Sequence, residues 1–377
     1  MATSLSCYDK RLPYNHSYTK VAKEKKIGVI RTDNHGLIFS YCLGPADRYQ
    51  FLKASGQLYI LEHKWEPVIP LRDTLITGCY GHLIEDRERW DPKDLEAADK
   101  MVETLAWQPE AFAKAFNCPI YDTLEEMANP ELFDGIFVGN CHWYGQDHIA
   151  MCMPFIKKGI PIFVDKPFAA NAKDAATLLK AAREYNCPIF CTSILYYDEM
   201  FHNLVDQKLG KAHLVVASSS CRIEERNGSV HNLAAMLGGY RFSNGNDYKI
   251  DSITFLGNDK SEPDKEVYKV DFTDGTIGIL NMGGVIPGGF RVDAFCEKGP
   301  FSEYAVEQSF RGGIVEICHE FSKMIDTRIP PVEYDRIFEF VAVLDAGIRS
   351  KAEGGRPVSI DEIAQEAGWT FGTSDKA

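Results

Sequence analysis

The sequence has no hydrophobic run long enough to cross a membrane and little positive charge to attract a polyanion. No stretch of the 377 residues approaches the ~18–20 consecutive apolar residues that a transmembrane helix requires. Acidic residues outnumber basic ones by 54 to 41, and the formal net charge is −13. Because phosphate backbones and anionic lipid surfaces repel such a chain, neither nucleic acid nor a membrane is an expected partner.

Paired cysteines and a secretory leader are also missing. None of the eleven cysteines belongs to a C-x-x-C motif, which excludes a zinc ribbon and a thioredoxin-type redox site. Their odd number and irregular spacing favour reduced thiols in a cytosol. The polar N-terminal segment, residues 1–25, lacks the apolar core of a secretory signal. We therefore expect a cytoplasmic protein that begins with a polar arm over residues 1–25.

The composition that remains is that of an ordinary globular protein with two domains. Hydrophobic residues make up 45% of the chain and charged residues 25%, which is the usual range for soluble domains. At roughly 100–200 residues per domain, the length is sufficient for two. Cores of that size need no disulfides for stability.

Up to about residue 190, short apolar segments alternate with helical ones. Strands are predicted at residues 26–30, 75–80, 119–121, 135–139, 161–164 and 188–191. Helices are predicted at residues 37–41, 94–104, 109–116, 123–127, 147–158 and 171–185. Gly159 supplies a C-terminal stop after one of these helices. Strands that alternate with helices predict a doubly wound parallel sheet.

The pattern changes at about residue 211, where strands follow one another directly. They are predicted at residues 214–220, 248–256, 267–272, 277–282 and 290–295, and helices return at 315–325 and 337–350. We therefore predict an α/β fold in two domains. Residues 26–167 form a Rossmann-like, dinucleotide-binding-type domain, and residues 168–377 form an α+β domain for substrate binding and oligomerisation. The second domain contains a large open antiparallel sheet, and its terminal helices are free to pack back on the first.

Several motifs occur together in a recognisable order. Residues 133–138 read FDGIFV, a helix led by His148 ends at Gly159, and a strand then runs into Asp165-Lys166-Pro167. Further on come the segment that ends at His231, a DGT hairpin at 274–276 and a terminal helix and strand at 350–359. In this order the chain resembles the glucose–fructose oxidoreductase / inositol dehydrogenase (Gfo/Idh/MocA) family over about residues 26–360. The resemblance implies NAD or NADP as cofactor, a carbohydrate-like substrate, and a homodimer or homotetramer that assembles through the open sheet.

The phosphate-binding loop is the main departure from that family. The six positions of its G-x-G-x-x-G fingerprint read Arg31, Thr32, Asp33, Asn34, His35 and Gly36. Only the last glycine remains, which serves helix–strand packing, whereas the first two let the backbone approach the pyrophosphate. Asp33 places a carboxylate near the phosphates at a cost on the order of 1 kcal/mol or more. Arg31 can offset that charge or bind phosphate itself. The cofactor is expected to contact these six residues and Asn140, His142 and His148.

Three residues are expected to carry the proton chemistry. Lys166 follows a predicted strand and precedes a proline, at the sheet edge where open α/β folds bind ligands; in the resembled family this lysine positions the substrate hydroxyl. His231 is the candidate general acid/base, because an imidazole pKa near ~6.5 suits proton exchange with a hydroxyl or carbonyl. Asn227 replaces the aspartate that the family often has four residues earlier, and its amide is able to orient the imidazole. The predicted catalytic residues are therefore Lys166, His231 and Asn227.

Aromatic residues near predicted strand ends are candidates for a sugar site, because sugar rings pack on aromatic faces. They are Trp143, Tyr144, Tyr196 and Tyr197. An ordinary core or interface role remains the alternative for all four. No metal is predicted, although Asp33, His35 and His142 offer ligand types that a metal accepts, without the tight H-x-x-x-H spacing of a strong motif.

Three functions remain open at this point. The leading hypothesis is an oxidoreductase that passes hydride between the C4 atom of a nicotinamide and a carbon of a sugar, cyclitol or sugar derivative. The second is a non-redox lyase or isomerase of a sugar derivative on the same fold, with or without a metal, suggested by the altered loop. The third is a catalytically silent binding protein. Because fold-level analogy carries much of the first hypothesis, the site must decide between them.

Overall fold

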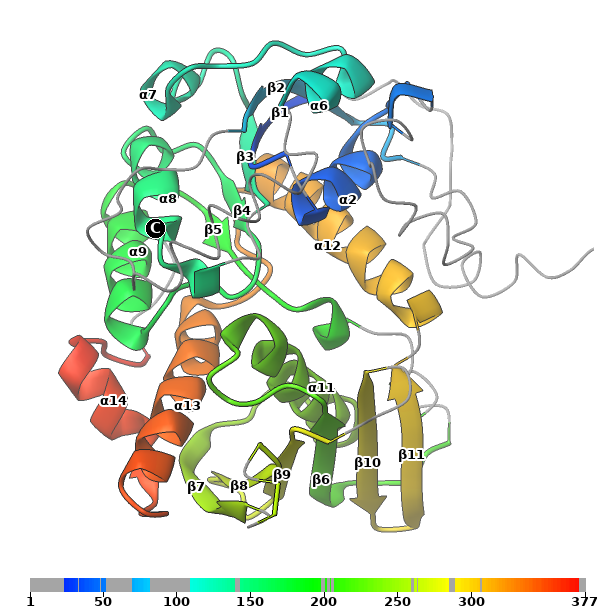
Figure 1. The fold of residues 1–377 in the computed structure, drawn as a ribbon, viewed down its shortest axis with the longest axis vertical. Helices are drawn as coiled ribbons and strands as arrows, with labels where there is room; N and C mark the ends of the chain where they lie inside the picture. Colours follow the sequence, from blue (N-terminus) through cyan, green and yellow to red (C-terminus); the bar gives the residue numbers. More distant parts are fainter. Residues whose placement is uncertain are drawn as a thin grey trace, which may run out of the picture.

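Two layered units make up the chain in the computed structural model (Figure 1). The structure describes residues 24–32, 34–47, 49–51, 70–81, 109–139, 143–197, 201, 204, 207–258, 261–262, 264–284, 289–305 and 307–372. Within these ranges the side chains of Asn34, Trp143 and residues 305–311 are not described. A parallel sheet with its helices occupies the upper part of Figure 1, and an open sheet occupies the lower part.

The first sheet is fully parallel and has five strands. They are β1 (Lys25–Ile30), β2 (Thr74–Tyr80), β3 (Gly135–Val138), β4 (Ile162–Val164) and β5 (Ile189–Phe190), in the order β2-β1-β3-β4-β5. Strands β1, β3 and β4 are almost wholly buried, as their continuous apolar runs require in a sheet covered on both faces. β1 begins one residue inside the predicted arm, and β5 lies beyond the predicted boundary at residue 167.

Helices cover both faces of this sheet. They are α2 (Asn34–Leu43), α6 (Pro109–Phe116), α7 (Leu124–Met127), α8 (His148–Ile156), α9 (Ala172–Glu184) and, from the end of the chain, α12 (Glu307–Thr327). Figure 1 shows α8 and α9 on one side of the sheet and α2 and α12 on the other. The predicted helix over 171–185 is confirmed with its caps, because the Asn171 side chain accepts a hydrogen bond from the Asp174 amide.

The second sheet has seven strands and is mixed. They are β6 (Ala212–Ser219), β7 (Ile250–Asn258), β8 (Glu266–Phe272), β9 (Ile277–Met282), β10 (Phe290–Cys296), β11 (Gly299–Ala305) and β12 (Val358–Ser359), in the order β11-β10-β6-β9-β8-β7-β12. The predicted fold class is confirmed, but β6 and β9 pair in parallel. The reason is the crossover helix α11 (Arg226–Asn244), after which the meander β7-β8-β9 returns to the side of β6.

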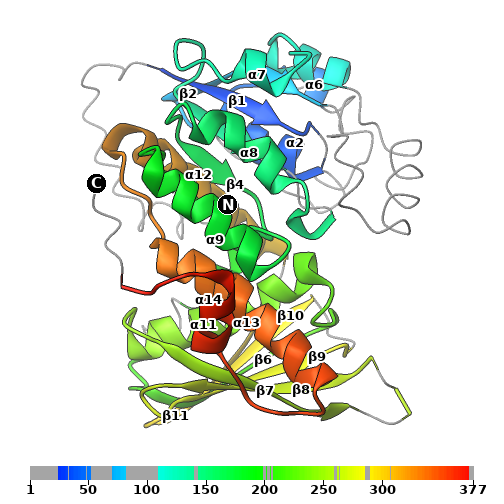
Figure 2. The same ribbon diagram turned by 90° about the vertical axis from the view of Figure 1, so that its left-hand side faces the viewer.

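One face of the second sheet packs on helices and the other is open. Helices α11 and α13 (Tyr334–Ala352) lie above it in Figure 2, and no described element lies below it. Alternation along the strands sends Val215 and Val292 toward α11, where both are fully buried. The same alternation leaves Ile277 and Phe295, each more than one third exposed, on the open face.

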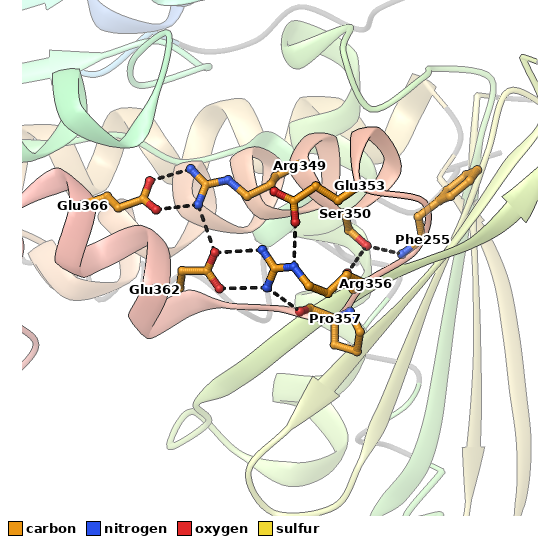
Figure 3. A network of polar contacts seen from close by, with 8 residues as sticks. All are labelled: Phe255, Arg349, Ser350, Glu353, Arg356, Pro357, Glu362 and Glu366. Atoms are coloured by element: carbon orange, nitrogen blue, oxygen red, sulfur yellow. Dashed lines mark hydrogen bonds and ion pairs between the residues drawn. The ribbon is translucent and has the colours of Figure 1, made fainter.

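The end of the chain ties the two units together. Helices α13 and α14 (Ile360–Ala367) pack against α9 of the first unit. Figure 3 shows a salt-bridge network on this segment, in which Arg349 meets Glu366 at 2.5 Å and Glu362 at 3.1 Å. Arg356 also reaches Glu362, at 2.9 Å. Because these groups are solvent-accessible, the pairs add little to stability.

Candidate active site

Several predicted site residues meet at the carboxyl edge of the parallel sheet, where the first turns of α11 approach it. The first turn of α2 contributes His35, and the loops after β4 and β5 contribute Asp165 with Lys166, and Ser193. Helix α11 contributes His231. Open α/β sheets bind their ligands at this edge. The topology therefore brings these sequence-predicted residues to the same edge of the sheet.

Lys166 is directed at the first turn of α11. Its side chain is only 6% exposed, and Nζ donates a 2.9 Å hydrogen bond to the backbone carbonyl of Asn227. The Lys166–Pro167 peptide bond is cis. Asn227 thus contributes a backbone oxygen that anchors the lysine. The predicted role of its side-chain amide in orienting His231 stays a prediction.

Ser193 holds the ring of His231. The Ser193 Oγ lies 2.6 Å from the His231 Nδ1, and it also accepts a 3.1 Å hydrogen bond from the Leu195 amide. Burial lowers the pKa of His231 well below its usual range, and the positive charges of Lys166 and His35 lower it further. The imidazole is therefore neutral at pH 7. Sequence analysis did not select Ser193, although a hydroxyl directly after the carboxyl end of β5 was a usable signal.

A second imidazole pairs with the aspartate of the D-K-P turn. His35 Nδ1 lies 2.7 Å from Asp165 Oδ2, and Asp165 is 2% exposed. Burial raises the pKa of Asp165, but the charges of His35 and Lys166 outweigh burial and bring it below the usual value. Asp165 is therefore ionised at neutral pH. The pair joins the altered loop after β1 to the turn that carries Lys166, a link that sequence analysis did not predict.

Arg31 stands at the first glycine position of the G-x-G-x-x-G fingerprint, and its backbone adopts a conformation that glycine favours. Its φ is 72°, in the left-handed region that costs an L-residue about 1–2 kcal/mol. Its amide donates a 2.7 Å hydrogen bond to the Tyr80 carbonyl, and its side chain is fully buried. The guanidinium Nη1 lies 3.8 Å from the Asp147 carboxylate, which is buried as well. Arg31 therefore points into the protein at the start of α8, which speaks against its predicted role as a direct phosphate ligand.

Gly36 brings helix α2 close to the sheet, as expected for the last glycine of the fingerprint. A Cβ at this position would lie 1.9 Å from the Arg31 carbonyl oxygen, and one at Gly139 would lie 2.5 Å from the Gly36 Cα. The backbones of α2 and of the segment after β3 thus touch without a side chain between them. Thr32, next to Arg31, is buried.

Backbone geometry provides the test of whether this loop suits a dinucleotide. The left-handed Arg31 and the side-chain-free contact between Gly36 and Gly139 reproduce the tight turn and the close helix packing of a dinucleotide-binding βαβ unit. The backbone of the described residues of the loop, 31–32 and 34–36, therefore fits the group, which the loop would hold. Asp33, Asn140 and His142 lie outside the described residues.

Two other predicted ligands have well-defined places. His148 is fully buried at the start of α8, and its Nδ1 lies 3.0 Å from the Phe168 carbonyl, which ties α8 to the segment after Lys166. Tyr144 has a left-handed backbone at φ 55°, in a loop that packs against residues 167–169. The roles of both residues in binding stay predictions.

The tyrosines after β5 pack within the protein. The Tyr196 ring is 8% exposed, lies under the Arg241 guanidinium at 3.7 Å and meets the Phe340 ring. Tyr197 packs edge-on against Tyr196, and burial raises its pKa above the usual range. Arg241 belongs to the last turns of α11, whereas His231 belongs to its first turns. These contacts favour the core alternative for both tyrosines.

No metal site emerges from the residues that the structure describes. Among them, no group of three or more histidine, cysteine, aspartate or glutamate side chains is arranged to hold an ion. Of the alternative metal set, Asp33 and His142 lie outside the described residues, and His35 pairs with Asp165.

Every helix in the described part of the chain is too short or too polar to span a bilayer.

Comparison with known proteins confirms the family resemblance. Residues 79–193 match the oxidoreductase family GFO_IDH_MocA, described by its NAD-binding Rossmann fold. Trans-1,2-dihydrobenzene-1,2-diol dehydrogenase of Xenopus tropicalis is 33% identical over 97 residues, 24% of this chain and 28% of that protein. The chain therefore matches less than a third of the length of this curated relative. The matched family segment begins after the altered loop.

Solved structures extend the resemblance in fold to most of the chain. Scyllo-inositol dehydrogenase of Lactobacillus casei with bound NAD(H) and scyllo-inositol is 12% identical at a TM-score of 0.61, covering 90% of this chain and 100% of that one. Myo-inositol dehydrogenase of the same organism, in complex with NAD(H) and myo-inositol, is 16% identical at a TM-score of 0.61, covering 89% and 96%. At such identities the similarity concerns the fold alone.

Proposed function

We propose that this chain, which carries the GFO_IDH_MocA resemblance over residues 79–193, is an oxidoreductase that uses NAD or NADP to oxidise or reduce a sugar, cyclitol or related polyol. The observation that carries the proposal is the placement of Lys166 and His231 at one sheet edge. A buried lysine anchored at Asn227 and a neutral imidazole held by Ser193 stand beside the dinucleotide-type turn. Solved proteins of this fold bind inositols and NAD(H) in their complexes.

Lys166 and His231 have different roles toward a substrate hydroxyl. When bound, the nicotinamide accepts or supplies the hydride. His231 takes the hydroxyl proton at Nε2, because its Nδ1 is engaged by Ser193. Lys166 donates a hydrogen bond to the same substrate oxygen and stabilises the negative charge that develops there. Its anchor at the Asn227 carbonyl, one helical turn before His231, holds the amine close to the imidazole.

A non-redox lyase or isomerase is the second candidate function. It would use Lys166 and His231 for proton transfer without a dinucleotide. The observation in its favour is the pairing of His35 with Asp165, which connects the altered loop to the catalytic turn instead of to a phosphate. Cofactor binding separates the two functions directly.

Titration with NAD(H) and NADP(H), followed by fluorescence or calorimetry, is expected to give saturable binding of one of the two. Treatment with a chelator should leave that binding unchanged. The variant Asp33→Gly should tighten it, because it removes a carboxylate near the pyrophosphate and restores close backbone approach. Turnover of a sugar derivative without binding of either dinucleotide would favour the lyase or isomerase function. A loss of activity in Asp33→Gly with no gain in affinity for the dinucleotide would do the same.

Assembly through the open face of the second sheet belongs to the same proposal. Ile277 on β9 and Phe295 on β10 are 36% and 39% exposed on this face, and alternation along both strands places them opposite α11. Apolar side chains that are exposed on an open sheet face gain from a cover. A second copy of the chain provides one, as a homodimer or as half of a homotetramer.

Light scattering at micromolar concentration is expected to give at least twice the mass of one chain. Phe295→Glu should shift the protein toward monomer, because it places a charge in the apolar face. Ile329→Glu is the matched control: Ile329 is 69% exposed in the segment after α12, away from the second sheet. A wild-type mass of one subunit would contradict the proposal.

A further inference from the structure

A small internal cavity lies directly behind the catalytic pair. Its volume is about 20 Å³, and it lies between the turn after Lys166, the end of β5, the first turns of α11 and helix α13. Most of its lining is apolar, but Thr192, Ser193 and Arg226 also contribute to it. A space of this size holds about one water molecule when two to four polar groups face it.

Two of the lining residues have buried polar atoms that lack a hydrogen-bond partner among the described residues. They are the Thr192 Oγ1 and the Arg226 Nη1. The other terminal nitrogen of Arg226 is bound to Asp345 at 2.5 Å, so the guanidinium is firmly placed. Buried polar groups in native proteins are nearly always satisfied by protein or by ordered water. Thr192 and Arg226 both belong to the lining of the cavity, and a water molecule in it would supply the partner that these two atoms lack.

The hydroxyl of Ser193 connects this cavity to His231. Its oxygen accepts a hydrogen bond from the Leu195 amide and lies 2.6 Å from the His231 Nδ1. A hydroxyl has one proton to donate. Either Ser193 donates that proton to Nδ1, which leaves the imidazole proton on Nε2, or Ser193 accepts from Nδ1–H and its own proton goes to another acceptor.

Only the arrangement in which Ser193 accepts from Nδ1–H leaves Nε2 able to accept a proton. That arrangement needs an acceptor for the proton of the Ser193 hydroxyl. A water in the cavity meets that need, since it can accept from Ser193 and from Arg226 while it donates to Thr192. Burial and the neighbouring Lys166 charge keep the pKa of His231 low, so the ring is neutral and carries a single proton. The position of that proton then decides whether His231 acts as a base.

We propose that one water molecule occupies this cavity, bridges Ser193, Thr192 and Arg226, and through Ser193 holds His231 in the tautomer with its proton on Nδ1. Ser193 is thus a positioning residue for His231. The choice of this tautomer rests on the proposed function, which needs Nε2 to accept a proton, whereas the water site does not. The same water satisfies the two buried atoms that otherwise lack partners.

Nitrogen-15 NMR of histidine-labelled protein tests the tautomer without any turnover. In the wild type the His231 signals, assigned by their loss in His231→Gln, should show a protonated Nδ1 and an unprotonated Nε2. Ser193→Ala should move the proton to Nε2. Ser193→Asp should return it to Nδ1, because a carboxylate accepts from Nδ1–H without help from the water. Thr192→Val should move part of the population to the Nε2 form, and the control Thr192→Ser should match the wild type.

Two further measurements complete the test. A high-resolution crystal structure should show one water within hydrogen-bond distance of Thr192, Ser193 and Arg226. With a substrate in hand, Ser193→Ala should lower kcat at least about 10-fold with little change in KM, because a misplaced imidazole proton affects the chemical step. The inference is overturned if the wild type shows the Nε2 form or if Ser193→Ala leaves the tautomer unchanged. If Ser193→Ala does not fold, Ser193→Thr and Thr192→Val supply the comparison. The expected tautomer in a protein without dehydrogenase activity would refute the proposed function and leave the inference standing.

Discussion

Replacing Lys166 with alanine is expected to lower kcat by ~10²-fold or more, the usual scale of positioned acid–base catalysis. The lysine is buried and its amine is held at the Asn227 carbonyl, so the substitution removes the hydrogen-bond donor proposed for the substrate oxygen. His231→Ala should cost a similar factor, since it removes the group that accepts the proton. Steady-state kinetics on the oxidation of a polyol or sugar with the cofactor that binds would measure both.

Lys173→Ala is the matched control for this experiment. Lys173 lies in the first turn of α9 and is exposed to solvent, so the substitution removes the same charge at a distance from the site. Its kcat and KM should equal those of the wild type. If Lys166→Ala and His231→Ala both retained full turnover, neither residue would belong to the mechanism, and the catalytic assignment would have to move elsewhere on the sheet edge.

The second large effect is expected from Gly36→Ala, which should destabilise the fold by about 3 kcal/mol or more through overpacking. The added Cβ would lie 1.9 Å from the carbonyl oxygen of Arg31, and this oxygen belongs to a backbone that cannot rotate away like a side chain. Gly139 closes the other side, since its backbone already touches Gly36. Helix α2 must therefore shift from the sheet or the loop after β1 must change shape.

Urea unfolding of Gly36→Ala beside Gly245→Ala separates steric overlap from backbone strain. Gly245 has a positive φ of 96°, but a Cβ there would meet nothing within 4 Å. Its substitution should therefore cost only backbone strain, about 1–3 kcal/mol for an L-residue at φ 96° and ψ 176°. Equal losses in the two variants would show that the contact between α2 and the sheet is not as tight as the structure has it. Gly36 belongs to the turn proposed to hold the dinucleotide, so Gly36→Ala should also weaken cofactor binding.

Local signals in the sequence sufficed for most elements of the fold. The helix predicted at 171–185 begins and ends as expected, because Asn171 supplies a cap within the same segment. The strand before Asp165-Lys166-Pro167 is present, and its continuous apolar residues are buried as a parallel sheet requires. Such signals depend on neighbours within a few residues, so one chain contains all the information needed to read them.

Contacts between distant segments could not be predicted from such local signals. The parallel pairing of β6 with β9 follows from the path of α11, which no local pattern specifies. The pairing of His35 with Asp165 joins residues 130 positions apart. Arg31 was expected near phosphate, yet it turns inward to Asp147, a carboxylate that the sequence placed only at the start of a helix.

The sequence by itself determined the α/β architecture and the position of Lys166 at a strand end, because periodicity and turn residues encode these features locally. It did not predict helix α11, which carries His231. Only the tertiary structure decided which groups meet there. Ser193 reaches His231 across 38 positions, and Lys166 reaches the Asn227 backbone across 61. Such partners depend on how β4, β5 and α11 pack, and packing is a property of the whole core that short-range patterns do not specify.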